Sequence, residues 1–425
     1  MKRTPAMQQP AFSPTLHLRL SAAVCAALAC SGAQAQGDGG LDWRFGGFGS
    51  IAATHASTRT ADFTSSIMKF SGAGGSRRWS PHVDSRLGAQ LDLEHGPRWS
   101  AVVQAISEQR SDGSYKPVVE WANIKYQFTP DLSLRLGRIA LPMFLAADYR
   151  KIGYAYPWIR TPVEVYDAIP LSNSDGVDAS YRWNHGALKN VTQVFVGNTG
   201  KPLWDGARIK AHGINGLTHT TAWGDASVRV SLLKAKVDID LARHLFDAYR
   251  QFGAPGAALG QRFDVVHRRV SAVSAGVNYD PGQWFAMGEL GRIKTGASYL
   301  GDTWTGYASA GYRFDAITAY LVYAGVDPDS ATSDPGLALD GMAPAQAQAG
   351  AFLNGQLNEL LATAAVQATA SAGVRWDVRP GLSLTLQYDR VRPRAGSRGT
   401  LINLKPGFES GRPVHVASAS LDFVF

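Results

Sequence analysis

The chain has 425 residues, a formal net charge of +8 and 18% charged residues. Over this length the positive excess is mild, and the basic residues do not gather in one stripe, which argues against nucleic acid as a partner. Both cysteines, Cys25 and Cys30, lie within the first 35 residues. The rest of the chain therefore offers no disulfide, no thiol chemistry and no cysteine metal site.

The N-terminal segment, residues 1–35, has the three parts of a secretory signal peptide. Basic residues come first, an apolar run follows over residues 20–29, and the segment ends on Ala33-Gln34-Ala35. An apolar core of about 10 residues before such a small-residue site predicts export and cleavage, here after Ala35. The mature chain would then be residues 36–425, and a lipoprotein signal at Cys30 is the alternative.

Beyond this segment no apolar run approaches the ~18 residues of a membrane-spanning helix. The longest run, residues 139–147, is interrupted by Pro142. Residues 83–94 instead alternate, with mostly apolar side chains at odd positions and mostly polar ones at even positions. This alternation indicates a strand with one apolar face. A mature chain that resides in a membrane must then be a closed barrel, because only helices and closed barrels satisfy their backbone in lipid.

The same alternation recurs along the chain and predicts sixteen strands. Most of them have the length that a tilted strand needs to cross a bilayer. They are expected at residues 41–53, 83–94, 99–109, 118–128, 132–139, 177–184, 188–198, 209–222, 226–237, 270–280, 283–294, 303–314, 316–325, 367–378, 381–391 and 414–425.

Short and long connections alternate strictly between these strands. The short ones contain turn residues, as in His95-Gly96-Pro97-Arg98 and Asp280-Pro281-Gly282. The long ones are expected near residues 54–82, 110–117, 140–176, 199–208, 238–269, 295–302, 326–366 and 392–413. Tight periplasmic turns opposite long outer loops are typical of an antiparallel transmembrane β-barrel. The predicted fold class is therefore all-β, in contact with outer-membrane lipid, and a soluble secreted β-protein is the alternative.

The last ten residues form an amphipathic strand that ends in an aromatic residue. Residues 417, 419, 421, 423 and 425 are apolar, whereas Ser418, Ser420 and Asp422 point to the other face. This segment resembles the closing strand of bacterial outer-membrane barrels, which ends in Phe and is read by the barrel-assembly machinery. The resemblance implies recognition of Phe425 by that machinery.

The signal peptide, about sixteen strands, a long third outer connection and the terminal Phe together resemble the general porins of Gram-negative bacteria. The resemblance implies a water-filled channel for passive diffusion of ions and small hydrophilic solutes, a third outer loop folded into the barrel, and a homotrimer. It implies no cofactor. Tyr156-Pro157-Trp158 and residues 162–166 are similar to segments of a porin-like subfamily without an assigned solute preference.

The third connection, residues 140–176, is the most distinctive segment. It holds five tyrosines or tryptophans between Tyr149 and Tyr166, and Pro157 and Pro162 stiffen its backbone, which predicts a packed loop. It mixes basic and acidic residues where the well-known porins have a short acidic loop. The residues predicted at the constriction are Asp148, Arg150, Lys151, Trp158, Arg160, Glu164 and Asp167.

Charged side chains at the narrowest point set the selectivity of a pore. Strand alternation predicts six basic residues on the wall of the lumen: Arg86, Lys125, Arg135, Arg229, Arg313 and Arg375. A transverse field would form if they faced the loop carboxylates Asp148, Glu164 and Asp167, and the basic excess predicts a weak anion preference. The alternative is pairing with carboxylates on neighbouring strands, as for Arg375 beside Asp377.

The sequence also bears on other functions. A substrate-specific channel for sugars, aromatic solutes or carboxylates is the main alternative, since the aromatic third connection could guide ring-bearing solutes. No G-x-S-x-G, H-E-x-x-H or Walker sequence occurs, so we expect no enzyme. The acidic residues near Asp327 could hold a calcium ion, although the EF-hand pattern fails at its glycine. Helix-like stretches at 241–249 and 345–368 would cap the pore mouth or pack on the barrel rim.

Overall fold

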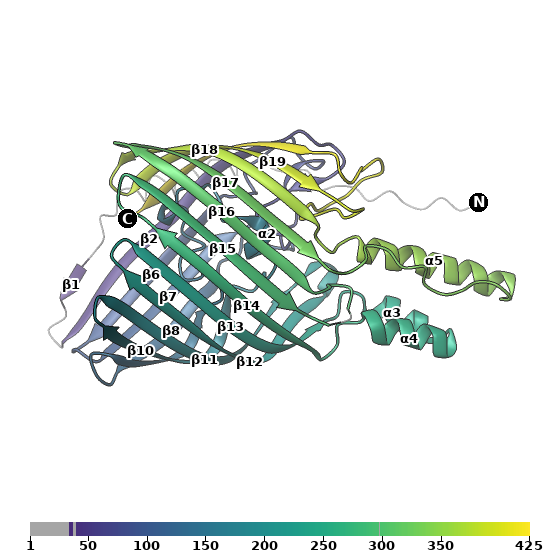
Figure 1. The fold of residues 1–425 in the computed structure, drawn as a ribbon, viewed down its shortest axis with the longest axis horizontal. Helices are drawn as coiled ribbons and strands as arrows, with labels where there is room; N and C mark the ends of the chain where they lie inside the picture. The colour runs from purple at the N-terminus through teal and green to yellow at the C-terminus, as the bar shows by residue number, and fades with distance from the viewer. Residues whose placement is uncertain (1–33, 37–39, 297) are drawn as a thin grey trace.

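The computed structural model describes residues 34–36, 40–296 and 298–425. Within this part of the chain, sixteen long strands form one closed antiparallel barrel (Figure 1). They are β2 (Leu41–Ala56), β6 (Arg86–His95), β7 (Trp99–Glu108), β8 (Val118–Gln127), β9 (Leu132–Ala140), β10 (Asn173–His185), β11 (Leu188–Pro202), β12 (Arg208–Trp223), β13 (Ala226–Ile239), β14 (Arg268–Tyr279), β15 (Trp284–Lys294), β16 (Thr303–Phe314), β17 (Ile317–Pro328), β18 (Gln367–Arg379), β19 (Leu382–Pro393) and β20 (Val414–Val424). The predicted fold class and all sixteen predicted strands are confirmed.

The first and last long strands close the barrel. Strand β2 pairs with β20 from Phe48↔Val424 to Ala56↔Val416. At the terminus the Gly47 N–H donates to the Phe425 carbonyl oxygen over 2.9 Å, and the Phe425 N–H donates back over 3.0 Å. The polar face of β20 points inward, where the Ser50 hydroxyl donates to Asp422 Oδ1 over 2.5 Å. Among the described residues no edge strand is left on the barrel, so the backbone groups are paired as a membrane requires.

The outer surface of the barrel is apolar because successive side chains of a strand point to opposite faces. On β13 the outward Val230 and Leu232 are 40% and 49% exposed, whereas Ser231 and Leu233 between them are buried. The apolar belt includes Leu290 and Leu321 on the strands that follow. None of the helices among the described residues is long and apolar enough to cross a membrane. The barrel with its apolar belt agrees with the predicted outer-membrane location.

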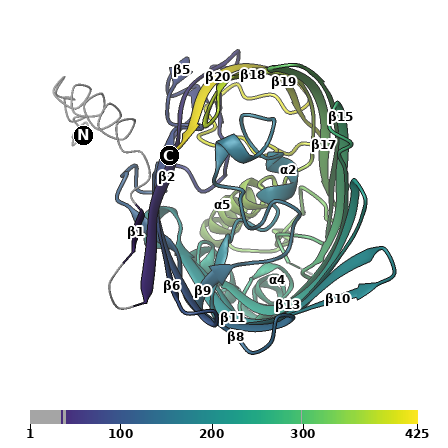
Figure 2. The same cartoon turned by 90° about the vertical axis from the view of Figure 1, so that its left-hand side faces the viewer.

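Turns and long connections lie at opposite ends of the barrel, as predicted (Figure 1). The first long connection holds β3 (Asp62–Phe63), β4 (Ala73–Gly74) and β5 (Trp79–Ser80), and the third holds η1 (Gly153–Ala155) and α2 (Val163–Tyr166). A further 3₁₀ turn, η2 (Trp204–Gly206), lies between β11 and β12. Seen along the barrel, α2 lies inside the ring of strands (Figure 2).

Three longer helices stand beyond the strands at the end with the long connections (Figure 1). They are α3 (Arg243–Arg250), α4 (Gly253–Phe263) and α5 (Pro344–Leu361). Helices were predicted at the positions of α3 and α5 but not of α4. The Tyr249 hydroxyl of α3 donates to Asn354 Oδ1 of α5 over 3.1 Å, so the helices pack on one another.

The predicted signal peptide lies outside the described residues except for its last two. Gln34–Gln36 form β1, which pairs with Asp42–Arg44 of β2.

Candidate functional site: the third connection and the cavity beside it

The third connection runs from the end of β9 into the lumen and returns to β10. At its base the Leu141 N–H donates to the Ser172 carbonyl oxygen over 3.0 Å. Its first turns are held by wall side chains of β12, β14 and β15. The Thr218 hydroxyl donates to the Pro142 carbonyl oxygen over 2.8 Å, and Glu289 Oε1 accepts the Leu145 N–H over 2.9 Å.

Aromatic side chains pack this connection, as its composition predicts. Tyr156, Trp158 and Tyr166 are 2–4% exposed. The Trp158 indole N–H donates to the Ser309 hydroxyl of β16 over 2.9 Å, and its ring lies 5.5 Å from the Tyr307 ring at 85°. Edge-to-face contacts of this kind stabilise a pair by about 0.5–1.5 kcal/mol beyond burial. Trp158 therefore fixes the connection to the wall and does not line an open channel.

Arg160 clamps the connection to the barrel. Its Nε and Nη2 donate to the two Asp84 carboxylate oxygens over 2.9 and 2.7 Å, and Nη1 donates to Asp389 Oδ2 over 2.6 Å. Nη2 also donates to the Ser418 hydroxyl of β20 over 2.6 Å. Burial alone would raise the pKa of Asp84, but the Arg160 guanidinium holds it below its usual range. All three charged side chains are at most 5% exposed, so this is a structural ion cluster.

The loop carboxylates Glu164 and Asp167 are also buried. Glu164 Oε1 accepts hydrogen bonds from the Gln367 amide, over 2.6 Å, and from the Thr369 hydroxyl. Asp167 accepts the Ile67 N–H of the first long connection. Burial raises the pKa of both carboxyls. Neither faces a wall arginine, so these two acids do not form the negative side of the expected transverse field.

Three of the six predicted wall cations contact the third connection. Arg375 Nη1 donates to the carbonyl oxygens of Tyr154 and Tyr156 over 3.0 and 2.7 Å. Arg375 also pairs with Asp377 at 2.8 Å, and such pairing with a neighbouring carboxylate is the alternative to a role in the constriction. Arg86 donates to the carbonyl oxygens of Arg150 and Lys151, at 3.4 and 3.5 Å.

Arg229 makes the third contact, in which its Nη1 lies 3.6 Å from Asp148 Oδ2. Among the described residues this is the only pair between a predicted wall arginine and a predicted loop carboxylate.

The other three predicted cations lie away from the loop. Arg135 of β9 pairs with Asp178 of β10 at 2.8 Å, and Lys125 is its cross-strand neighbour on β8. Arg313 binds Asp280 of the β14–β15 turn at 2.7 Å, at the end of the barrel opposite the long connections. In the described part of the chain none of these three cations makes a hydrogen bond or an ion pair with the third connection, and they do not assemble into one ring with the loop.

An open cavity of about 250 Å³ lies between the third connection and the wall formed by β6 to β11. Nine Lys or Arg residues and four Asp or Glu residues line it among the described residues, so its charge is predominantly positive. We call it the basic cavity. Its cations are Lys69, Arg86, Arg110, Lys116, Arg138, Arg150, Lys151, Arg160 and Lys201, and its acids are Glu108, Glu120, Asp167 and Asp175.

All three cations of the predicted loop set, Arg150, Lys151 and Arg160, line this cavity. Arg150 and Lys151 line the basic cavity with Arg86 opposite, and Lys151 pairs with Glu108 of β7. Lys69 comes from the first long connection, where its Nζ donates to the His82 carbonyl oxygen over 3.1 Å. Burial lowers the pKa of Lys69 to about 8, although Glu108 opposes this shift.

Sequence alternation missed Arg138, which lines the basic cavity. Period 2 puts Arg138 on the face opposite Arg135, because the two positions differ by three, an odd number. Gly137 has φ +126°, a conformation that side-chain-bearing residues rarely adopt, yet the pairing of β9 with β8 and with β10 runs through it without a register shift. Leu136 faces outward at 61% exposure, and Arg138 binds Asp175 with two hydrogen bonds of 2.7 and 2.8 Å.

The suggested calcium site does not assemble. No three potential ligands converge on a metal position anywhere in residues 34–36, 40–296 and 298–425. Asp329 lies 3.7 Å from Arg292, and Asp334 binds Arg262 at 3.0 Å, so the two acids are drawn to different cations.

Solved structures with the same architecture are known. The outer membrane channel DcaP of Acinetobacter baumannii is 11% identical, covers 92% of this chain and 100% of its own, and has a TM-score of 0.55. The anion-selective porin from Comamonas acidovorans is 12% identical over 91% of this chain and 99% of its own, with a TM-score of 0.52. OmpF of Salmonella typhi, solved with daunomycin, is 10% identical over 92% and 100%, with a TM-score of 0.52.

No protein-family model matches the sequence, and neither does any curated protein. At such identities the structural likeness concerns the fold. The chain has the sixteen-stranded fold of the outer-membrane porins, as its resemblance to them implied.

Proposed function

We propose that this chain forms a water-filled outer-membrane channel through which small hydrophilic solutes diffuse passively, with a preference for anions. Solutes pass beside the third connection through the basic cavity. The observation that carries the proposal is the charge of this cavity: apart from Arg160, which Asp84 and Asp389 neutralise, eight cations outnumber four acids. The solved structures with this fold that are named above include an outer membrane channel and an anion-selective porin, and this supports the proposal.

The physical basis is the field of the cavity wall. A cleft lined by one sign of charge and bounded by low-dielectric walls concentrates counter-ions. Two cations of the cavity are well placed for testing: Lys116 is exposed and has no ion pair in the described part of the chain, and Arg110 lies 3.9 Å from the exposed Asp112. Their removal leaves no buried carboxylate unpaired.

The test is the reversal potential of the purified protein in a planar bilayer with a tenfold KCl gradient. We expect stable current steps and a potential of the sign that anion flow produces. The double variant Arg110→Glu, Lys116→Glu changes the cavity by four charges and should abolish or invert the preference. The matched control, Arg243→Glu with Arg379→Glu, changes exposed residues of α3 and of the opposite end of β18 and should shift the potential less.

Two outcomes would reject the proposal in distinct ways. A folded barrel without any conductance would mean that the connections plug the lumen. Conductance with equal permeability for K⁺ and Cl⁻ would support the channel and reject the anion preference.

We also propose a homotrimer, as the porin resemblance implies, and no enzymatic role. The mass of the detergent-solubilised protein, determined by light scattering after subtraction of the detergent, tests the oligomeric state. Current steps in groups of three would support the same assembly, and a monomeric mass would contradict it.

A further inference from the structure

A group of cations lies on the outer surface of the barrel, away from the lumen. Lys234 and Lys236 of β13, Arg269 of β14 and Lys294 of β15 are all exposed. They alternate with buried residues such as Leu233 and Ala235, so they point outward. None of the four side chains has a hydrogen bond or an ion pair in the part of the chain that the structure describes. We call them the cationic outer row.

The strand register brings these cations together. Lys236 lies directly opposite Arg269. Lys234 and Lys294 are both opposite Ser271, one on each side, so their backbones are two strand spacings, about 10 Å, apart. Like charges on facing positions of a sheet destabilise it. An anion placed between them would relieve that repulsion.

Nearby charges do not neutralise the row. Asp238, the next outward residue on β13, faces His267 at 3.0 Å and His212 at 4.0 Å. Arg292 of β15 adds a further cation, although Asp329 lies 3.7 Å from it and its guanidinium stacks over the Trp304 ring at 4.7 Å. The surface over β13 to β15 therefore stays positive.

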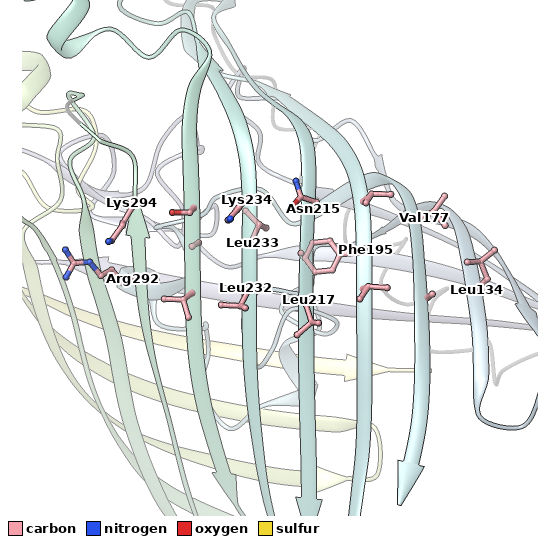
Figure 3. Close-up of a pocket in the computed structure, with 17 residues that line it drawn as sticks. Leu134, Val177, Phe195, Asn215, Leu217, Leu232, Leu233, Lys234, Arg292 and Lys294 are labelled. Atoms are coloured by element: carbon pink, nitrogen blue, oxygen red, sulfur yellow. The ribbon is translucent and has the colours of Figure 1, made fainter.

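An apolar hollow of about 670 Å³ lies directly beside the row. Figure 3 shows Arg292 and Lys294 at the left of the hollow and Lys234 above Leu232 and Leu217. The apolar lining extends to Leu134 at the right. Along β13 the outward residues change from Val230 and Leu232 to Lys234 and Lys236 without an intermediate. This change marks the boundary between hydrocarbon and polar headgroups.

We propose that the cationic outer row and the hollow form a binding site for a phosphate-bearing, multiply acylated lipid of the outer leaflet. The phosphates would lie against Lys234, Lys236, Arg269 and Lys294, and the acyl chains would fill the hollow. Long lysine and arginine side chains can keep their charge at the interface while their stems lie on apolar surface. The site does not depend on the proposed channel, because it lies on the opposite face of the wall.

Native mass spectrometry of the intact, detergent-solubilised barrel tests this site with lipid A, a bisphosphorylated glycolipid with several acyl chains. We expect saturable binding, and the variant Lys234→Gln, Lys294→Gln should weaken it by about tenfold or more. The control variant Arg243→Gln, Arg379→Gln removes the same charge from exposed positions that do not line the hollow and should bind as the native protein does. Both variants change exposed side chains, and heat-modified gel mobility verifies that the barrels are folded.

Two further probes separate the parts of the ligand. Phosphatidylethanolamine, which is acylated but has no net charge, and inorganic phosphate, which has no acyl chain, should each bind much more weakly than lipid A. Equal binding of phosphatidylethanolamine, or lipid A binding unchanged in the Lys234 and Lys294 variant, would overturn the proposal. Binding of phosphate at the affinity of lipid A would reject the lipid and leave an anion site.

Discussion

The two sides of the third connection use the same kinds of side chain to different ends. On the side toward β18–β20, Arg160 is enclosed by Asp84 and Asp389, and Glu164 by Gln367 and Thr369. On the side toward β6–β11, the cations that include Arg150 outnumber the acids around an open cavity. A charge that has its full set of partners holds the loop, whereas a charge in excess remains available to a solute. Residue type alone does not distinguish these roles.

The largest expected effect comes from breaking the anchored side. Arg160→Met leaves the Asp84 and Asp389 carboxylates buried without their cation, which costs about 3–5 kcal/mol in comparable cases. We expect a lower midpoint of heat-induced gel-mobility change and a noisier single-channel current, since the loop is no longer clamped. Arg44→Met serves as the control, because Arg44 and its partner Glu94 are 57% and 54% exposed and no buried carboxylate loses its cation. A midpoint that falls no further in Arg160→Met than in Arg44→Met would contradict the clamp.

A smaller effect is expected where the loop touches the wall at η1. A Cβ atom on Gly153 would lie 2.3 Å from Asp422 Oδ1 and 2.6 Å from Ser50 Oγ, two atoms that are hydrogen-bonded to each other. Gly153→Ala should therefore displace the loop tip, lower stability by about 1–3 kcal/mol and change the conductance. Gly355→Ala on α5 is the control, because nothing lies within 4 Å of that position. Unaltered stability and conductance in Gly153→Ala would show that the contact is not tight.

The smallest expected effect concerns the open side and its pH dependence. With a pKa of about 8, Lys69 is charged at pH 7 and loses its proton as the pH rises through that value. Anion preference should therefore decline between pH 7 and pH 9, as measured by the reversal potential. In Lys69→Gln the preference should be weaker at pH 7 and should not decline over this range. An identical pH profile in both proteins would exclude Lys69 as the titrating group.

The barrel could be predicted from the sequence because strand alternation and turn residues are local properties. Residues 83–94 and 414–425 alternate between lipid and lumen, and both became strands of the closed barrel. Their bounds shifted by a few residues, for instance to 173–185 where 177–184 was expected. The extension follows from pairing with β9, which a single strand does not reveal.

The candidate site was predicted only in part. Arg86, Arg150 and Lys151 line the basic cavity, whereas Glu164 turns to the Gln367 and Thr369 side chains of β18. Lys69 reaches the cavity from the first long connection, more than seventy residues before the loop that it faces. No spacing in the sequence connects those segments.

The sequence by itself determined the number and order of the strands, their two faces and the ends at which the connections lie, because these follow from the period of the side chains and from local turn chemistry. Only the tertiary structure decided which loop charges are paired and which are free. That outcome depends on contacts between segments far apart in the chain, such as those that bring Lys69 of the first long connection to the cavity beside the third connection.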